Sequence, residues 1–207
     1  MNIEFIKANN FPGNPRPMMS EVFVEGWYND LKMISKDKEK LQRAFEHIFD
    51  LDGFYLAVVD QKIMAFVGVC SRINKKRIAY FDKKACRKGL GFIRGSFAAL
   101  VLNKVLVEKD YPFEIPVGTG IIEFVATLPE ARGQGLAGKL IEYTMADNEY
   151  QDYILEVIDT NHGAINLYER LGFVEFTRVK SPYPPQKAGF EEFIYMGTDS
   201  SKMKGAG

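Results

Sequence analysis

A glycine-rich segment that follows an apolar run holds the residues best suited to chemistry in this sequence. Gly133, Gly135 and Gly138 stand where the apolar run 119–127 gives way to a predicted helix. Glycine lets the backbone approach a ligand closely because it has no Cβ atom. The first N–H groups of a helix and the positive end of its dipole favour an anion. The segment therefore predicts a phosphate-binding loop, although a tight turn without a ligand would use the same glycines.

Two common phosphate-binding motifs fit this loop only in part. Residues 133–138 read Gly-Gln-Gly-Leu-Ala-Gly, the GxGxxG pattern of dinucleotide-binding proteins, and Glu156 lies near the distance at which that fold places an acidic residue. Residues 128–132 separate the apolar run from the first glycine, whereas the dinucleotide turn follows its strand directly. Gly133 to Lys139 also begins like a Walker P-loop, but Leu140 replaces the hydroxyl residue that binds Mg²⁺.

A third motif covers more of the segment. Residues 125–137, Val-Ala-Thr-Leu-Pro-Glu-Ala-Arg-Gly-Gln-Gly-Leu-Ala, resemble motif A of the GCN5-related N-acetyltransferase (GNAT) family, with Arg132, Gly135 and Ala137 in its fixed places. Residues 155–173 resemble motif B and follow at the separation of that family. The resemblance implies an α/β fold of the GNAT type. This fold is a twisted, mixed, mostly antiparallel sheet flanked by helices, here with an inserted helical segment between strands 3 and 4.

The resemblance implies acetyl-CoA as co-substrate and no metal. The pyrophosphate would lie on backbone N–H groups of the loop, which Arg132 would set unless it only forms a surface salt bridge. The end of the preceding strand would pair with the pantetheine amides and direct one N–H group at the thioester oxygen, unless ordinary sheet pairing uses these groups. Asn161 would contact the cofactor or merely cap a helix. The residues assigned to the cofactor are Val125, Ala126, Thr127, Arg132, Gly133, Gln134, Gly135, Leu136, Ala137, Gly138 and Asn161.

Two side chains are candidates for catalysis. Tyr168 matches the family tyrosine that protonates the departing CoA thiolate, a task that suits a phenol; the alternative is a packing role in its helix. Glu123 stands among apolar residues, where a carboxylate is costly to bury without a partner. The family often places a base on this strand, so Glu123 would accept the amine proton, bind the substrate ammonium or form a salt bridge. Neither Cys70 nor Cys86 has a histidine near it in the sequence, which favours direct attack by the amine over an acyl-enzyme.

The apolar periodicity predicts the elements that position these residues. Strands are expected over 2–7, 53–59, 63–70, 119–127, 153–158, 173–179 and 190–196. Helices are expected at 23–31, 41–48, 92–107, 135–150 and 161–171, with residues 71–91 irregular and loops over 109–118 and 181–187. This order predicts one GNAT-like domain over 1–197, with an insertion at about 71–118 and a disordered tail, 198–207.

Composition narrows the class of protein. The 207 residues are 46% apolar and 26% charged, which is typical of a folded globular chain. Lys+Arg and Asp+Glu both number 27, so the net charge gives no sign of a nucleic-acid or anionic membrane partner. Two cysteines cannot build a disulfide scaffold, and the N-terminus has no apolar signal segment. We therefore expect a cytoplasmic protein.

The charges are distributed unevenly. Residues 72–94 contain nine basic residues and one acid, and residues 140–169 contain seven acids and no Lys or Arg. Both could be solvated faces. Otherwise we expect the insertion to shape the acceptor entrance, or to form a homodimer contact.

The function favoured by these features is transfer of acetyl from acetyl-CoA to a primary amine, either a small molecule or a peptide. The alternatives are a non-catalytic acyl-CoA-binding sensor and a dinucleotide-binding oxidoreductase, an NAD-dependent dehydrogenase. No motif identifies the acceptor.

Overall fold

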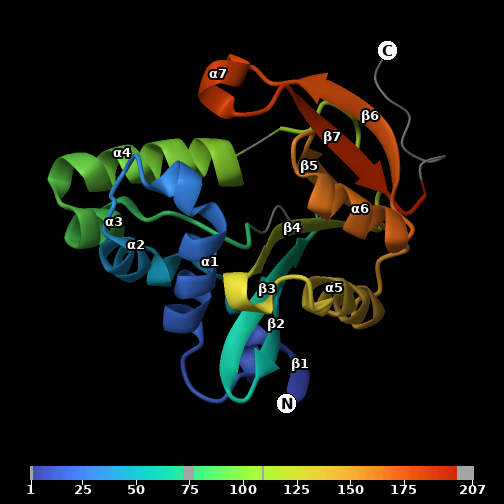
Figure 1. Ribbon diagram of the computed structural model, residues 1–207, viewed down its shortest axis with the longest axis horizontal. Coiled ribbons are helices and arrows are strands. Elements are labelled where there is room, and N and C mark those ends of the chain that lie inside the picture. The colour runs from blue at the N-terminus through green and yellow to red at the C-terminus, as the bar shows by residue number, and fades with distance from the viewer. Residues whose placement is uncertain (1, 72–76, 109, 200–207) are drawn as a thin grey trace. The chain divides into compact units, whose positions relative to one another are not determined.

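The computed structural model describes residues 2–71, 77–108 and 110–199 (Figure 1). The strands are β1 (Ile3–Lys7), β2 (Phe54–Val59), β3 (Lys62–Cys70), β4 (Thr119–Thr127), β5 (Asp152–Ile158), β6 (Val174–Lys180) and β7 (Glu192–Gly197). The helices are α1 (Arg16–Leu31), α2 (Lys38–Phe45), α3 (Lys83–Leu90), α4 (Phe92–Leu102), α5 (Leu136–Ala146), α6 (His162–Arg170) and α7 (Pro185–Ala188). Among the residues described, no helix is both long and apolar enough to cross a membrane.

The seven strands follow the order β1-β2-β3-β4-β5-β7-β6. Strand β2 pairs antiparallel with β1 and β3, β4 pairs parallel with β5, and β7 pairs antiparallel with β5 and β6. Helices α3 and α4 come between β3 and β4 in the chain. The predicted fold class, a mixed and mostly antiparallel sheet flanked by helices, is confirmed.

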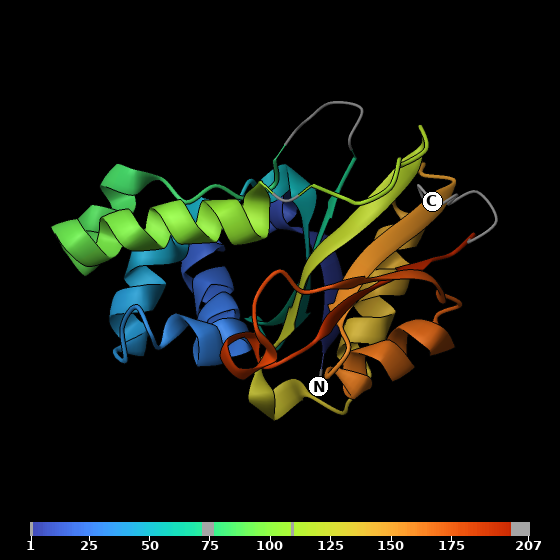
Figure 2. The same ribbon diagram turned by 90° about the horizontal axis from the view of Figure 1, so that it is seen from above.

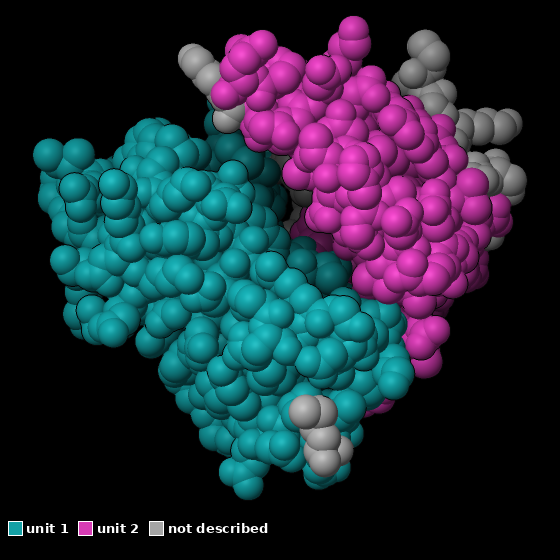
Figure 3. Space-filling view, in the orientation of Figure 1, with its two compact units in different colours: residues 1–68, 77–109, 124–140 teal, residues 69–76, 110–123, 141–207 magenta. Residues whose placement is uncertain are grey.

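The chain divides into two compact units (Figure 3). Unit 1 comprises residues 1–68, 77–109 and 124–140, and unit 2 comprises residues 69–76, 110–123 and 141–207. The division passes through β4 and α5, which both contribute to each unit. The single domain predicted over 1–197 stays a prediction.

Unit 1 is built around an aromatic cluster. The ring of Phe23 on α1 lies 5.8 Å from that of Phe45 on α2 and 6.5 Å from that of Phe124 on β4. Trp27, also on α1, stacks on Phe66 of β3 with an interplanar angle of 13°. Buried aromatic rings supply large apolar areas. The cluster therefore explains why α1 and α2 pack where they do, and it ties both helices to the strand that leads into the glycine loop.

The insertion adds two helices to unit 1, and α3 and α4 lie side by side in both views (Figures 1 and 2). Helix α3 begins after Asp82, whose carboxylate accepts the N–H of Ala85 at 2.8 Å. A Cβ atom added to Gly89 would lie 2.6 Å from the Cβ of Ala44, so this glycine allows α3 to contact α2 closely. The irregular structure predicted over 71–91 is therefore wrong for residues 83–90; residues 72–76 lie outside the described residues.

The rest of the insertion agrees better with expectation. Helix α4 continues into a π-helical segment, Asn103–Val107, which confirms a helix over 92–107. The Asn103 side chain fixes this junction, because its Oδ1 accepts the N–H of Phe81 and its Nδ2 donates to the Phe81 carbonyl, both at 2.9 Å. Residues 110–118 contain no helix or strand, as predicted for this described part of the loop.

The core of unit 2 includes a cluster of four buried side chains, Phe113, Ile121, Ile154 and Tyr195. Two predicted bounds are wrong in this part of the chain. Helix α5 ends at Ala146 rather than Tyr150, because the Asn148 side chain donates to the carbonyl of Thr144 and caps the last turn. The loop over 181–187 contains the short helix α7. Thr198 is held by Tyr153, whose N–H donates to its Oγ1 at 2.9 Å, while residues 200–207 of the predicted tail lie outside the described residues.

Candidate active site

The end of β4 in unit 1 has an unusual backbone conformation. Phe124 has a φ of +51°, in the left-handed region that residues other than glycine rarely adopt. Such a residue carries about 1–3 kcal/mol of strain and persists only where its surroundings impose it. Its buried ring packs against Phe23, Trp27 and Phe54. The aromatic cluster therefore holds the strand in a turned conformation directly before the predicted pantetheine-binding residues, 125–127.

Side chains fix the path of the loop after β4. The N–H of Leu128 donates to the carbonyl of Met64 at 2.8 Å. Arg132 Nε donates to the carbonyl of Thr127 at 3.1 Å, and Gln134 Nε2 donates to the carbonyl of Glu130 at 2.8 Å. The first bond ties the start of the loop to β3, the second ties the loop to the end of β4, and the third lies within the loop. The contact of Arg132 is the one expected of a residue that sets the loop.

Gly133 and Gly135 give the loop its conformation. Their φ values are +74° and +75°, and both residues are exposed. No heavy atom lies within 4 Å of a Cβ added to either one, so there is space for a side chain. Glycine is favoured here because of the positive φ. Helix α5 starts at Leu136, and the N–H of Lys139 donates to the carbonyl of Gly135 at 3.2 Å. The N–H groups ahead of Lys139 stand in the first helical turn, where no intrahelical acceptor is available.

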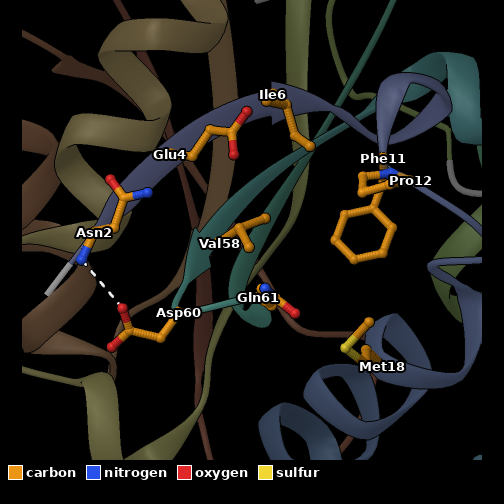
Figure 4. Close-up of a pocket in the computed structure, with 9 residues that line it drawn as sticks. All are labelled: Asn2, Glu4, Ile6, Phe11, Pro12, Met18, Val58, Asp60 and Gln61. Atoms are coloured by element: carbon orange, nitrogen blue, oxygen red, sulfur yellow. Dashed lines mark hydrogen bonds between the residues drawn. The ribbon is translucent and has the colours of Figure 1, made fainter.

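A cavity elsewhere in unit 1 shares none of the predicted site residues. It measures about 570 Å³ and lies beside β1, the β2–β3 turn and the start of α1 (Figure 4). Polar atoms at one end are already paired, since the N–H of Asn2 donates to Asp60 Oδ1 at 3.2 Å. We assign this cavity no part in the chemistry of the glycine loop.

In unit 2, Glu123 on β4 is half-buried and held at both oxygens. The hydroxyl of Tyr111 donates to Oε1 at 3.0 Å, and the thiol of Cys70 donates to Oε2 at 3.8 Å. Burial and then the charge of Glu123 raise the pKa of Tyr111, so this phenol stays a hydrogen-bond donor at any ordinary pH. Within the described part of the chain, Glu123 has neutral donors as partners and no cation. The salt bridge considered for this residue is absent there.

Helix α6 of unit 2 carries the other two predicted side chains. Tyr168 is buried, and its ring meets that of Phe173 edge-on at 6.1 Å. Burial raises the pKa of Tyr168 to about 12, so the phenol is protonated at neutral pH, as a proton donor must be. Asn161 precedes the helix, and its side-chain oxygen accepts the N–H of Ala164 at 3.2 Å. The helix-capping role of Asn161 is therefore present.

The predicted residues fall into three groups. Residues 125–138 form one continuous segment of unit 1. Glu123 belongs to a cluster in unit 2, and in the same unit Asn161 caps the helix α6 that contains Tyr168. The sequence prediction missed Tyr111 and the contact of Cys70 with Glu123, because no local pattern marks either residue.

Cys86 is fully buried and burial raises its pKa to about 12, which makes this thiol a poor nucleophile. No group of three or more His, Cys, Asp or Glu side chains suited to a metal occurs among the described residues.

The chain is similar to known acetyltransferases over most of its length. Residues 18–173 match the acetyltransferase (GNAT) family. Over 106 residues it is 34% identical to N-alpha-acetyltransferase 30 of Schizosaccharomyces pombe, an alignment that covers 48% of this chain and 71% of that protein. Over 105 residues it is 32% identical to the ribosomal protein bS18-alanine N-acetyltransferase of Escherichia coli, which covers 49% of this chain and 64% of that one.

A solved structure extends the likeness of fold to almost the whole chain. The structure described as histone acetyltransferase HPA2 and related acetyltransferase from Corynebacterium glutamicum superposes with a TM-score of 0.61 over 96% of both chains, at 20% identity. The order of strand, glycine loop and helix is the one that the sequence predicted for this family, and the family match covers residues 18–173. The chain therefore belongs to the acetyltransferase (GNAT) family.

Proposed function

We propose that this acetyltransferase moves the acetyl group of acetyl-CoA to a primary amine by direct attack in a ternary complex. The observation that carries the proposal is the glycine loop, residues 132–138, in which left-handed Gly133 and Gly135 lead into α5 in a chain of the GNAT family. Backbone N–H groups presented in this way suit a pyrophosphate. Arg132 supports the loop through its bond to Thr127.

The cofactor would be bound mainly through the backbone. Residues 133–138 would hold the pyrophosphate, and Val125, Ala126 and Thr127 would pair with the pantetheine amides. One N–H group of this strand end would stabilise the oxyanion that forms on the thioester carbonyl. The turned backbone at Phe124 supports this role, because it interrupts regular strand geometry immediately before these residues. Asn161 would add a contact while it caps α6.

Two side chains would move protons. The amine nitrogen attacks the thioester carbonyl carbon, and Glu123 accepts a proton from that nitrogen, directly or through a water. When the carbon–sulfur bond breaks, Tyr168 gives its hydroxyl proton to the CoA thiolate and regains one from solvent. The pKa of about 12 for Tyr168 is consistent with a phenol that is protonated before each cycle. The burial of Cys86 and the role of Cys70 as a donor to Glu123 favour direct attack over a thioester on the enzyme.

The acceptor is proposed from the relatives. The yeast relative is named for N-alpha-acetylation, and the bacterial one for acetylation of an alanine of a ribosomal protein. We therefore infer that the amine of a protein or peptide is the acceptor to test first, ahead of small-molecule amines.

The reaction needs no metal, nucleic acid or membrane partner. A second copy of the chain is proposed as a partner at the exposed side of α4, where Ile93 and Leu100 face solvent.

The experiment that tests the function is an acetyl-transfer assay read by mass spectrometry. Peptides with different first residues would be compared with polyamines, aminoglycosides and free amino acids, each with acetyl-CoA. We expect acetylated product from at least one peptide and a rise in melting temperature with acetyl-CoA, which binds only the folded state. Protection by acetyl-CoA without any acetylated acceptor would favour a non-catalytic sensor, and protection by NAD alone would favour the oxidoreductase.

A further inference from the structure

A row of polar side chains crosses one face of the unit 2 sheet. It consists of Cys70 at the end of β3, Glu123 on β4, Glu156 on β5 and Tyr195 on β7; we call these four residues the polar row. Ile122 and Leu155 form the last pair of the parallel β4–β5 register, and Glu123 and Glu156 are the next residues of the two strands. The charges of both carboxylates act on Tyr111, so both lie near this phenol. Glu156 pairs with Tyr195 in the β5–β7 register. All four residues belong to the same compact unit.

Tyr111 lies over this row and is fixed from two sides. Its ring meets the ring of Tyr195 at 6.0 Å and that of Phe113 at 5.7 Å. Its hydroxyl donates to Glu123 Oε1 at 3.0 Å. The aromatic contacts set where the phenol lies, so the hydrogen bond in turn sets how the Glu123 carboxylate is rotated.

The charges of the row make such a donor necessary. Two carboxylates on neighbouring strands repel each other when both are ionised. Each of them has a phenol beside it: Tyr111 donates to Glu123, and Tyr195 is the register partner of Glu156 on β7. Burial first, and then the charge of Glu156, raise the pKa of Tyr195, so it too remains a donor. Among the described residues, the titratable groups known to lie beside the two carboxylates include Tyr111, Tyr195 and the Cys70 thiol.

The two donors to Glu123 leave part of its carboxylate available. An ionised carboxylate offers about four lone-pair sites. Among the described residues, Tyr111 uses one site on Oε1 and Cys70 uses one on Oε2, which leaves lone pairs on both oxygens for an amine or a water. A carboxylate held in one orientation, with acceptor capacity left, is what a general base requires.

We propose that Tyr111 is a positioning residue for the acetyl transfer, in that it orients the Glu123 carboxylate and stabilises its charge while Cys70 supports the other oxygen. This inference rests on the proposed function, because it assumes that Glu123 accepts the amine proton. Tyr111 itself touches neither substrate nor cofactor in this proposal.

The test is Tyr111→Phe, measured as turnover against pH with one acceptor throughout. A hydrogen bond to a charged group is strong, so we expect kcat to fall by about threefold to tenfold, less than in Glu123→Gln, with little change in KM for acetyl-CoA. Loss of a donor to the ionised carboxylate lets it take a proton at higher pH, so the acidic limb of the profile should move to higher pH. Protonation of the acceptor amine affects the pH–rate profiles of the wild type and the variant equally. A difference between the two profiles therefore comes from the enzyme.

Tyr153→Phe is the matched control. Tyr153 is a buried tyrosine of the same unit whose hydroxyl donates to the carbonyl of Met145 at 3.0 Å, so this variant also loses a hydrogen bond. We expect it to melt earlier than the wild type but to keep the wild-type position of the limb. A limb that moves equally in both variants, or in neither, overturns the positioning role.

A second pair of variants covers the case in which Tyr111→Phe does not fold. Cys70→Ala removes the donor to Oε2 and should move the limb in the same direction by less, whereas Cys70→Ser should restore it. Equal limbs in both Cys70 variants would overturn the proposal. If Glu123→Gln transfers acetyl more slowly than the wild type, but the Tyr111 and Cys70 variants behave as wild type, only the positioning role fails. If the wild type transfers acetyl to no amine, the proposed function fails and the positioning role fails with it.

Discussion

In the proposed reaction, the glycine loop would act through backbone groups and the polar row through side chains. In the loop the functional groups are backbone N–H groups, and the backbone is unusual because Gly133 and Gly135 are left-handed. In the row the functional groups are side chains, and most of the backbone is ordinary strand with a regular register. The loop should therefore tolerate changes of side chain that preserve its backbone, whereas the row should be sensitive to the loss of a single oxygen or sulfur atom.

The two regions also differ in how they are held. The loop is fixed by contacts close in sequence, such as that between Arg132 and Thr127. Glu123 is fixed by Cys70, which is 53 positions away, and by Tyr111 from the loop before β4. A local fault should abolish the loop, while the row should lose its function by degrees as its donors are removed one at a time.

The largest effect is expected from Gly135→Val, which attacks the loop through its backbone. A β-branched residue at a φ of +75° is strained, so the loop should change conformation, and the added side chain would lie on the face proposed for the phosphate. We expect the acetyl-CoA-dependent rise in melting temperature to disappear and turnover to fall below detection. Thermal denaturation with and without acetyl-CoA measures the first effect.

A pair of alanine variants isolates the cause. Gly135 and Gly163 both have no heavy atom within 4 Å of an added Cβ, but only Gly135 has a positive φ. Gly135→Ala should weaken acetyl-CoA binding and Gly163→Ala should not. An unchanged acetyl-CoA shift in Gly135→Val would sink the loop assignment.

The next effect in size is expected from Tyr168→Phe, which removes one hydroxyl and keeps the ring contact with Phe173. Turnover should fall by roughly 10² or more, while the Kd of acetyl-CoA should barely change. Because the pKa of Tyr168 is about 12, its ionisation should cost no activity up to about pH 10. Normal turnover in this variant would return Tyr168 to a packing role.

Glu123→Gln should have a smaller effect, about tenfold to a hundredfold on turnover, since a water can replace part of the function of the base. Activity that depends on an ionised carboxylate is lost as the pH falls, so the enzyme's own contribution to the acidic limb should vanish in this variant. The pH–rate profile measures it with the same acceptor as for the wild type. A variant that melts earlier but keeps the limb would indicate that Glu123 is structural.

The same contrast explains what the sequence could predict. Strand β4 has the predicted bounds, 119–127, because its apolar run is continuous, and the loop was recognisable because its glycines and Arg132 are contiguous. Helix α3 was missed because it is short and polar. Its cap on Asp82 and its close contact with Ala44 at Gly89 decide the structure there.

The partners of Glu123 were not predictable for a different reason. Tyr111 lies in a segment without periodicity, and Cys70 meets Glu123 only through the arrangement of strands. Glu156 and Tyr195 become neighbours only through the β5–β7 register. A network of this kind is a property of strand pairing, which a one-dimensional pattern of residues does not contain.

The smallest effect on activity is expected at the exposed side of α4. This surface differs from both the glycine loop and the polar row, because we assign it no role in the reaction. Ile93 is 82% exposed and Leu100 is 72% exposed, and with Phe97 they follow one face of the helix. A surface of this kind usually marks an interaction site. We expect wild-type protein to self-associate through it and Ile93→Lys with Leu100→Lys to be monomeric, at unchanged turnover. Sedimentation at several protein concentrations measures the mass.

Salt distinguishes the two ways in which copies could meet. If α4 packs on α4 of a second copy, Arg94 and Lys104 come near like charges, so added salt should strengthen the association by screening. If instead the basic insertion meets the acidic region 140–169 of the second copy, added salt should weaken it. Met33→Lys, a change at a residue that is 76% exposed and outside α4, is the control and should leave the mass unchanged. Equal masses for wild type and the α4 variant at every salt concentration would remove α4 as a dimer contact, and an altered acceptor profile in that variant would then assign the helix to the acceptor side.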